Sequence, residues 1–76
     1  MTIQVLGTGC SKCKQLTANA EQAVADLGLD ATIEKVTELH DIMEAGVMMT
    51  PALAIDGEVK AAGKVLSVDQ IKQLIE

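Results

Sequence analysis

The spacing of apolar residues changes several times along the chain, and each change marks a predicted element. Residues 2–6 combine strand-forming side chains with partial alternation, which predicts a β-strand. From residue 11 the apolar positions recur every three or four residues as far as Leu27, which predicts one face of a helix. Gly28 follows where a C-terminal helix cap belongs. The chain therefore opens with a strand and a long helix.

A less regular pattern covers the next segment. Residues 31–36 predict a second strand, and the charged side chains inside it favour a position near a sheet edge. The apolar residues of 39–43 share one helical face, which predicts a helix of about two turns. Thr37 is the expected cap at its start, and Gly46 ends it.

The last third of the chain carries the clearest local signals. Residues 52–55 form an uninterrupted apolar run that suits a central strand. The Asp-Gly dipeptide at 56–57 is a strong hairpin signal, and residues 58–61 alternate charged with apolar side chains, which predicts a strand with one face in water. Ser67 and Gln70 have the spacing of a capping box and predict the start of a last helix.

The predicted order βαβαββα places residues 1–76 in a single α/β domain. A long helix joins the first two strands, which predicts a parallel pair with a right-handed crossover. The hairpin makes the last two strands antiparallel. We therefore expect a mixed four-stranded sheet with helices on both faces.

Composition narrows the classes of function. The 76 residues include no Phe, Tyr or Trp, so no platform for base stacking is present. Six Lys and Arg residues against eleven Asp and Glu give a net charge of -5, which argues against nucleic-acid binding. The sequence has no apolar run long enough for a membrane span and no leader pattern. We expect a cytoplasmic monomer that binds neither nucleic acid nor membrane.

Cys10 and Cys13, the only two cysteines, lie three residues apart between the first predicted strand and the first helix. A helix N-terminus favours an anion, and Cys-x-x-Cys pairs at such a position typically have a lowered thiol pKa. Lys12 adds positive charge and is the candidate for tuning the Cys10 thiolate. Cys13 belongs to the apolar stripe of the helix and is expected to be the more buried thiol.

Two thiols at this spacing can exchange electrons with a substrate disulfide. Cys10 would attack the substrate to form a mixed disulfide, and Cys13 would then attack the Cys10 sulfur and release the reduced substrate. A purely structural disulfide is disfavoured, because it would close a very short loop in a reducing compartment.

Four features together resemble a known family. They are Cys10-Ser11-Lys12-Cys13 after the first strand, Thr50-Pro51 before the third strand, the Asp-Gly hairpin, and Gly63 before the last helix. Over its whole length the chain resembles the small redox-active disulfide proteins of the thioredoxin and glutaredoxin superfamily from archaea and bacteria. The resemblance implies a thioredoxin-like fold and a thiol–disulfide oxidoreductase that reduces protein disulfides without a cofactor. It also implies a thioredoxin reductase or similar electron donor and disulfide-containing protein substrates.

The resemblance assigns roles to individual residues. It implies that Cys10 is the nucleophile and Cys13 the resolving thiol, that Pro51 has a cis peptide bond, and that the backbone of Thr50 pairs with the bound substrate. We expect one of the two methionines at 48–49 to point into the core and the other to contact partners, with Met49 as the substrate-binding candidate.

The chain also departs from typical thioredoxins at two places. Gly9 stands where they have Trp, and residues 2–6 contain no acidic side chain to accept a proton behind Cys13. These departures indicate a narrower set of partners or a different base. Glu34 and Lys35 are interpreted as surface charges without a role.

Two other functions stay open at this point. Two thiolates also suit Cu(I), and copper chaperone domains carry Cys-x-x-Cys after a first strand. Those domains usually have the order βαββαβ and a Met two residues before the first cysteine, where this chain has Thr8. A structural zinc site needs four ligands, and beyond the two cysteines the sequence offers only one histidine, His40. We therefore expect no metal. The third possibility is a redox-inert adaptor domain.

Overall fold

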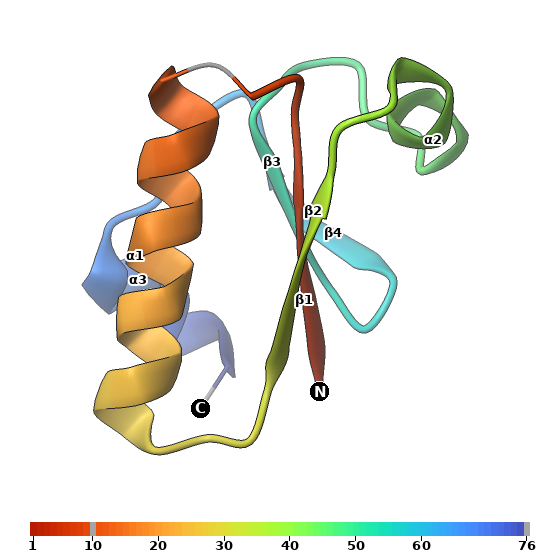
Figure 1. Cartoon of the computed structure of the whole chain (residues 1–76). Coiled ribbons are helices and arrows are strands. Elements are labelled where there is room, and N and C mark those ends of the chain that lie inside the picture. Colours follow the sequence, from red (N-terminus) through yellow and green to blue (C-terminus); the bar gives the residue numbers. More distant parts are fainter. Residues whose placement is uncertain (10, 76) are drawn as a thin grey trace.

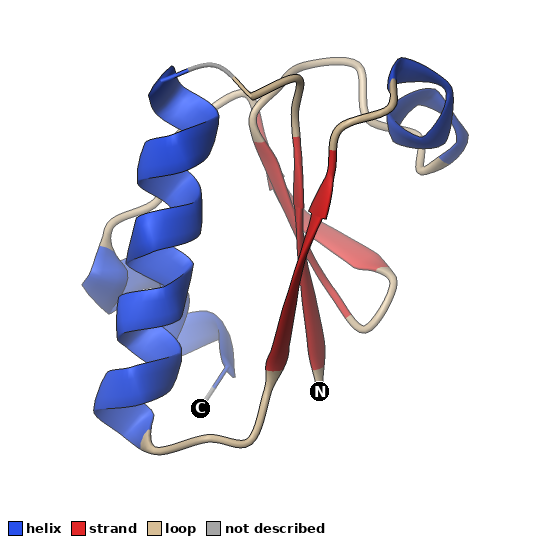
Figure 2. Ribbon diagram, viewed as in Figure 1, coloured by secondary structure: helices blue, strands red, loops and turns tan. Residues whose placement is uncertain are grey.

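Seven helices and strands form in the order that the apolar pattern predicts (Figure 1). The computed structural model describes residues 1–9 and 11–75. The elements are β1 (Thr2–Leu6), α1 (Ser11–Leu27), β2 (Thr32–Val36), α2 (Leu39–Glu44), β3 (Ala52–Ile55), β4 (Glu58–Ala62) and α3 (Val68–Ile75). Figure 2 shows α1 and α3 on one face of the sheet and α2 on the other side, at one end of the strands.

The four strands form one mixed sheet in the order β2-β1-β3-β4. β1 and β2 are parallel, whereas β3 runs antiparallel to both β1 and β4. The parallel pair, the antiparallel hairpin and the edge position of β2 are therefore confirmed. β3 is a central strand with all four residues buried, as its apolar run predicts.

Alternation along the two central strands divides the core between the faces of the sheet. Ile3 and Val5 of β1 pack with Leu53 of β3 against α1 and α3. Leu6 and the neighbouring alanines of β3 lie on the opposite face, beneath Ile42 of α2. Because no aromatic side chain is present, both cores consist of small and aliphatic side chains.

Two local sequence signals have the predicted geometry. Asp56 and Gly57 both have positive φ values, 50° and 85°, and they connect the paired residues of β3 and β4 in a two-residue turn. At the start of α3 the Ser67 N–H donates to Gln70 Oε1 at 2.9 Å, and the Gln70 N–H donates to Ser67 Oγ at 3.2 Å. These two hydrogen bonds between Ser67 and Gln70 form a reciprocal capping box.

Two predictions about exposure and capping were wrong. The N-cap of α2 is Glu38 rather than Thr37, and no side-chain hydrogen bond caps this helix. β4 is exposed along most of its length instead of on one face, and even Val59 is 37% exposed. Ala61 is the one β4 residue that packs against the larger core, and β4 lies at an edge of the sheet.

An ion pair joins the two helices that share a face of the sheet. Lys72 Nζ of α3 lies 3.0 Å from Asp26 Oδ2 of α1, and Gln22 also donates a hydrogen bond to this carboxylate. The hydrogen bond from Lys72, followed by that from Gln22, holds the pKa of Asp26 below its ordinary value of 3.8. The pair therefore stabilises the fold when the carboxylate is ionised.

We expect Asp26→Asn to be less stable than the parent chain at about pH 7, and the difference to disappear on acidification. Because the folded-state pKa is the lower one, the stabilisation is complete well above 3.8 and is lost as the pH falls below that value. Urea unfolding midpoints measured between about pH 7 and about pH 2 test this, with Asp30→Asn as the control for loss of one acidic charge. A difference that stays constant over the whole range would show that the ion pair is not its source.

Candidate functional site

The two predicted thiols lie at the start of α1, where the chain leaves the sheet. Cys10 lies outside the residues that the structure describes. Cys13 is in the first turn of α1 and is buried, with 5% of its surface exposed. Its burial agrees with its place in the apolar stripe of the helix.

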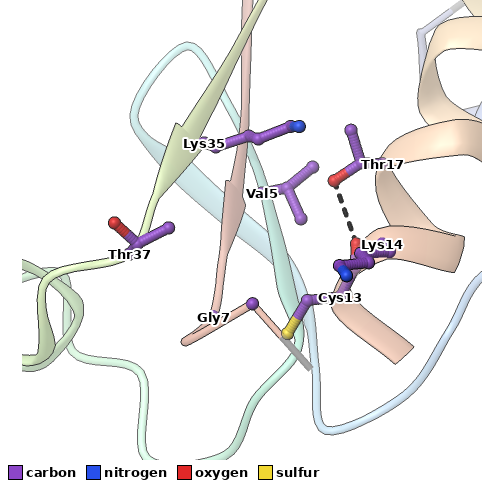
Figure 3. Close-up of a pocket in the computed structure, with 8 residues that line it drawn as sticks. Val5, Gly7, Cys13, Lys14, Thr17, Lys35 and Thr37 are labelled. Carbon is purple, nitrogen blue, oxygen red and sulfur yellow. Dashed lines mark hydrogen bonds between the residues drawn. The ribbon is translucent and has the colours of Figure 1, made fainter. Parts of the chain in front are cut away.

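The Cys13 sulfur points toward the loop that follows β1 (Figure 3). A Cβ atom added to Gly7 would overlap Cys13 Sγ, and it would lie 3.8 Å from the Cα atom of Pro51. Gly7 does not have a positive φ, so a contact rather than the backbone conformation requires glycine here. Gly7 therefore lies between the Cys13 sulfur and the backbone of Pro51, which comes from a distant part of the sequence.

The Thr50–Pro51 peptide bond is cis, as the resemblance implies. Pro51 is fully buried, and its carbonyl accepts a hydrogen bond of 2.9 Å from the Gly63 N–H. Thr50, one residue earlier, is exposed. The loop is thus fixed at Pro51 and presents its preceding backbone to solvent.

The prediction that one of the two methionines points into the core was wrong. Met48 is 96% exposed and Met49 is 63% exposed. Val47 is the residue of this loop that enters the smaller core, beside Ile42. Met49 lies instead over Gly63, where an added Cβ would come within 3.1 Å of both Cβ and Cε of the methionine.

An open groove of about 520 Å³ lies between α2 and the loop that contains the methionines. It is lined by Thr8, Leu39, Ile42, Met43, Gly46, Val47, Met48 and Thr50. Three residues form the apolar face of α2. Ile42 is buried, whereas Leu39 and Met43 are 61% and 66% exposed. Met48 lines the groove together with Thr50, whereas Met49, the substrate-binding candidate, is not among the lining residues.

A smaller cavity of about 110 Å³ lies behind the Cys13 thiol. It is lined by Val5, Gly7, Gly9, Cys13, Lys14, Thr17, Lys35 and Thr37 (Figure 3). Thr17 Oγ1 donates a hydrogen bond of 2.9 Å to the Cys13 carbonyl. Lys35 is exposed, as predicted, and it also lines this cavity.

Sequence reasoning missed both Gly7 and Lys35. The contact of Gly7 with Cys13 depends on how α1 docks on the sheet, and no local pattern encodes that distance. The orientation of Lys35 could be predicted from the sequence, because Lys35 lies two residues after Ile33 and therefore on the same face of β2. Ile33 packs against the core beneath α1, so the same parity directs Lys35 toward α1.

Lysines supply the charge at the beginning of α1. Lys12 is exposed in the first turn, Lys14 lines the small cavity, and the first turn contains no acidic residue. The predicted effect of Lys12 on the Cys10 thiolate stays a prediction, because Cys10 lies outside the described residues.

The described residues contain neither a cluster of metal ligands nor a membrane-spanning helix. In residues 1–9 and 11–75, no group of three or more His, Cys, Asp or Glu side chains is placed to hold a metal ion. His40 lies on the exposed side of α2 and pairs with Glu44 at 2.9 Å. No helix in the described part of the chain has both the length and the apolar character to cross a bilayer.

Comparison with known proteins gives a match along the full chain. A thioredoxin domain family model matches residues 1–76. A thioredoxin of Methanothermobacter thermautotrophicus is 48% identical over 75 residues, which cover 99% of this chain and 97% of the relative. A thioredoxin of Methanocaldococcus jannaschii is 44% identical over 73 residues, which cover 96% of this chain and 84% of the relative.

Proposed function

We propose that Cys10 and Cys13 carry the electrons in this chain. The chain belongs to the thioredoxin domain family and is a thiol–disulfide oxidoreductase. Cys10 attacks the substrate disulfide, so that a Cys10–substrate disulfide forms and one substrate thiolate leaves. Cys13 then attacks the Cys10 sulfur, which closes the Cys10–Cys13 disulfide and releases the second substrate thiolate. The substrate gains two electrons and the protein loses two.

The observation that supports these roles most strongly is the position of Cys13. Its thiol is buried against Gly7, so a protein disulfide has little access to its sulfur. A thiol of this kind is suited to the intramolecular step. By elimination, the intermolecular attack falls to Cys10, the other thiol of the Cys-x-x-Cys pair.

Thr50 and Pro51 are proposed to bind the substrate backbone. Thr50 is exposed at the edge of the large groove, while Pro51 is held by the hydrogen bond to Gly63. A substrate segment that pairs with the backbone of Thr50 would lie over Met48 and Met49, whose flexible thioethers adapt to different side chains. We keep Met49 as a substrate contact and add Met48, because Met48 lines the groove.

The proposed electron donor is a thioredoxin reductase or a similar protein, and the proposed substrates are proteins that contain accessible disulfides. The two thiols alternate between dithiol and disulfide, so the cycle needs no bound cofactor. We propose a cytoplasmic location, where the reductant pool can return the pair to the dithiol form.

The test is equilibration of the protein in glutathione or dithiothreitol buffers, followed by alkylation of the remaining thiols. We expect one reversible two-electron transition with a midpoint between about -270 and about -220 mV, the range of pairs that reduce other proteins. Alkylation and peptide mapping should show that both thiols disappear together. A chain that forms no intramolecular disulfide but binds one Cu(I) through the two thiols would replace this proposal with metal carriage.

A further inference from the structure

The resolving step requires a negative charge on the buried Cys13 sulfur. Its thiol must lose a proton before the sulfur can attack, because the thiolate is the nucleophile in disulfide exchange. Cys13 is 5% exposed and has little contact with bulk water. An anion formed in such a place costs free energy unless nearby cations or dipoles compensate. The first turn of α1 supplies backbone dipoles, and the small cavity next to the sulfur is lined by charged side chains.

The ionisable side chains that line this cavity, among the described residues, are Cys13, Lys14 and Lys35. β1 contributes Val5, the loop after it contributes glycines, and the segment after β2 contributes Thr37. The loop that contains Pro51 brings methionines and Thr50, which do not titrate. Cys10 lies outside the described residues. The described charges that line the same cavity as Cys13 are therefore cationic, and they come from α1 and β2.

The direction of Lys35 follows from the pairing of β2 with β1. Lys35 is the parallel register partner of Val5, whose side chain is buried beneath α1. Glu34 lies on the opposite face, where Gln4 Nε2 donates to its carboxylate at 3.5 Å. Figure 3 shows Lys35 reaching from β2 across Val5 toward α1. The strand thus directs its cation to the thiol side of the sheet and its anion to the other side.

The cavity also provides a route for the proton. Its volume of about 110 Å³ holds three or four water molecules at about 30 Å³ each. Thr17 Oγ1 donates to the Cys13 carbonyl and can accept a hydrogen bond from such a water. Lys14 and Lys35 provide N–H donors at the cavity wall. Water in this space can take the Cys13 proton and pass it to solvent.

We propose that Lys35 is the positioning residue for the resolving step and that it stabilises the Cys13 thiolate across the cavity. This inference rests on the proposed roles of Cys10 and Cys13. In the step itself the Cys13 proton passes to cavity water, a bond forms between the two cysteine sulfurs, and the Cys10–substrate bond breaks. The electron pair of the broken bond leaves with the substrate sulfur, which then takes a proton from water.

The test is single-turnover reaction of the reduced protein with a neutral dipyridyl disulfide in a stopped-flow instrument. The first thiopyridone is released when Cys10 attacks, at a rate proportional to reagent concentration. The second is released when Cys13 resolves the mixed disulfide, at a rate independent of concentration. We expect Lys35→Met to slow the second phase by about three- to tenfold at about pH 7 and to change the first by less than about twofold.

Three matched variants make the result specific. Lys35→Arg keeps the charge and should restore the second phase. Lys60→Met removes an equal charge from β4, at the opposite edge of the sheet, and should leave both phases unchanged. Lys14→Met should slow the second phase in the same direction, since Lys14 also lines the cavity. The Lys35→Met defect should become smaller at about pH 9, where the thiolate forms with less help.

The outcomes separate the inference from the function on which it rests. A normal second phase in Lys35→Met, or a defect that is equally large at both pH values, would overturn the role of Lys35. Equal slowing of both phases would also overturn it, because it would indicate a general effect on the site. If the parent chain itself showed no concentration-independent phase, the assigned roles of Cys10 and Cys13 would fail first.

Discussion

Replacement of Cys10 by Ser is expected to reduce the catalysed reduction of insulin disulfides to the background rate of the chemical reductant, a loss of about a thousandfold or more. The serine hydroxyl is not ionised at neutral pH and cannot take the place of a thiolate nucleophile. Cys13 cannot substitute for it, because its sulfur is buried against Gly7. The measurement is the rate of insulin reduction with dithiothreitol as electron donor.

Cys13→Ser should fail in a different way. The nucleophile remains, so the first step proceeds and the mixed disulfide accumulates because no second thiol resolves it. Non-reducing electrophoresis should show covalent adducts with a disulfide-containing protein for Cys13→Ser and none for Cys10→Ser. Thermal unfolding of both variants checks that the fold survives. Adducts formed by Cys10→Ser would reverse the two assigned roles.

The elements that the sequence predicted correctly are those defined by local chemistry. The Asp56-Gly57 turn needs two positive φ values, and this dipeptide tolerates them. The Ser67 and Gln70 capping box satisfies backbone groups within one helical turn. The apolar run of β3 predicted its central place, because only a strand covered on both faces buries every side chain.

The errors concern residues whose environment is set by distant parts of the chain. Met48 and Met49 are both exposed, because Val47 occupies the core position available to that loop. Val59 of β4 is exposed at the sheet edge, whereas Ala61 of the same strand packs against the larger core. Whether an apolar side chain is covered depends on which element packs above it, and periodicity reports only which face it is on.

The site shows the same division between local and distant information. The Cys-x-x-Cys spacing and the Thr-Pro dipeptide identified the chemistry, and the structure adds the contact between Gly7 and the Cys13 sulfur. It also adds Lys35, which β-strand register brings to the cavity from a position 22 residues after Cys13 in the sequence. The Gly7 contact arises from packing of α1 on the sheet, which no local pattern specifies, whereas alternation along β2 indicates the face on which Lys35 lies.

Gly7→Ala is expected to impair disulfide formation more than it impairs folding. The added methyl group would overlap Cys13 Sγ, so the sulfur must turn to another rotamer or α1 must shift. Overpacking of this kind costs about 1–3 kcal/mol. In the dithiol form the sulfur can rotate away, whereas a disulfide fixes its position relative to Cys10. We therefore expect the disulfide form to be destabilised selectively, with a midpoint potential about 20–60 mV less negative.

The control for a general loss of stability is Gly28→Ala. Gly28 has a φ of 64° and open space around it, so alanine there strains the backbone at the end of α1 without touching the site. This variant should lose about 1 kcal/mol of unfolding free energy and keep the parent potential. A Gly7→Ala protein with the parent potential would show that Gly7 does not control the position of the Cys13 sulfur.

A double-mutant cycle isolates the contact itself, because it subtracts whatever Gly7→Ala does elsewhere. Cys13→Ala removes the sulfur that the added methyl group would overlap and leaves Cys13 Cβ, which lies 3.3 Å from the added atom. Gly7→Ala should therefore cost less in the Cys13→Ala background than in the parent chain, with a coupling energy of about 0.5–1 kcal/mol by urea unfolding under reducing conditions, where the sulfur only has to change its rotamer. Equal costs in the two backgrounds would place the origin of the Gly7 effect in the loop rather than in its contact with the sulfur.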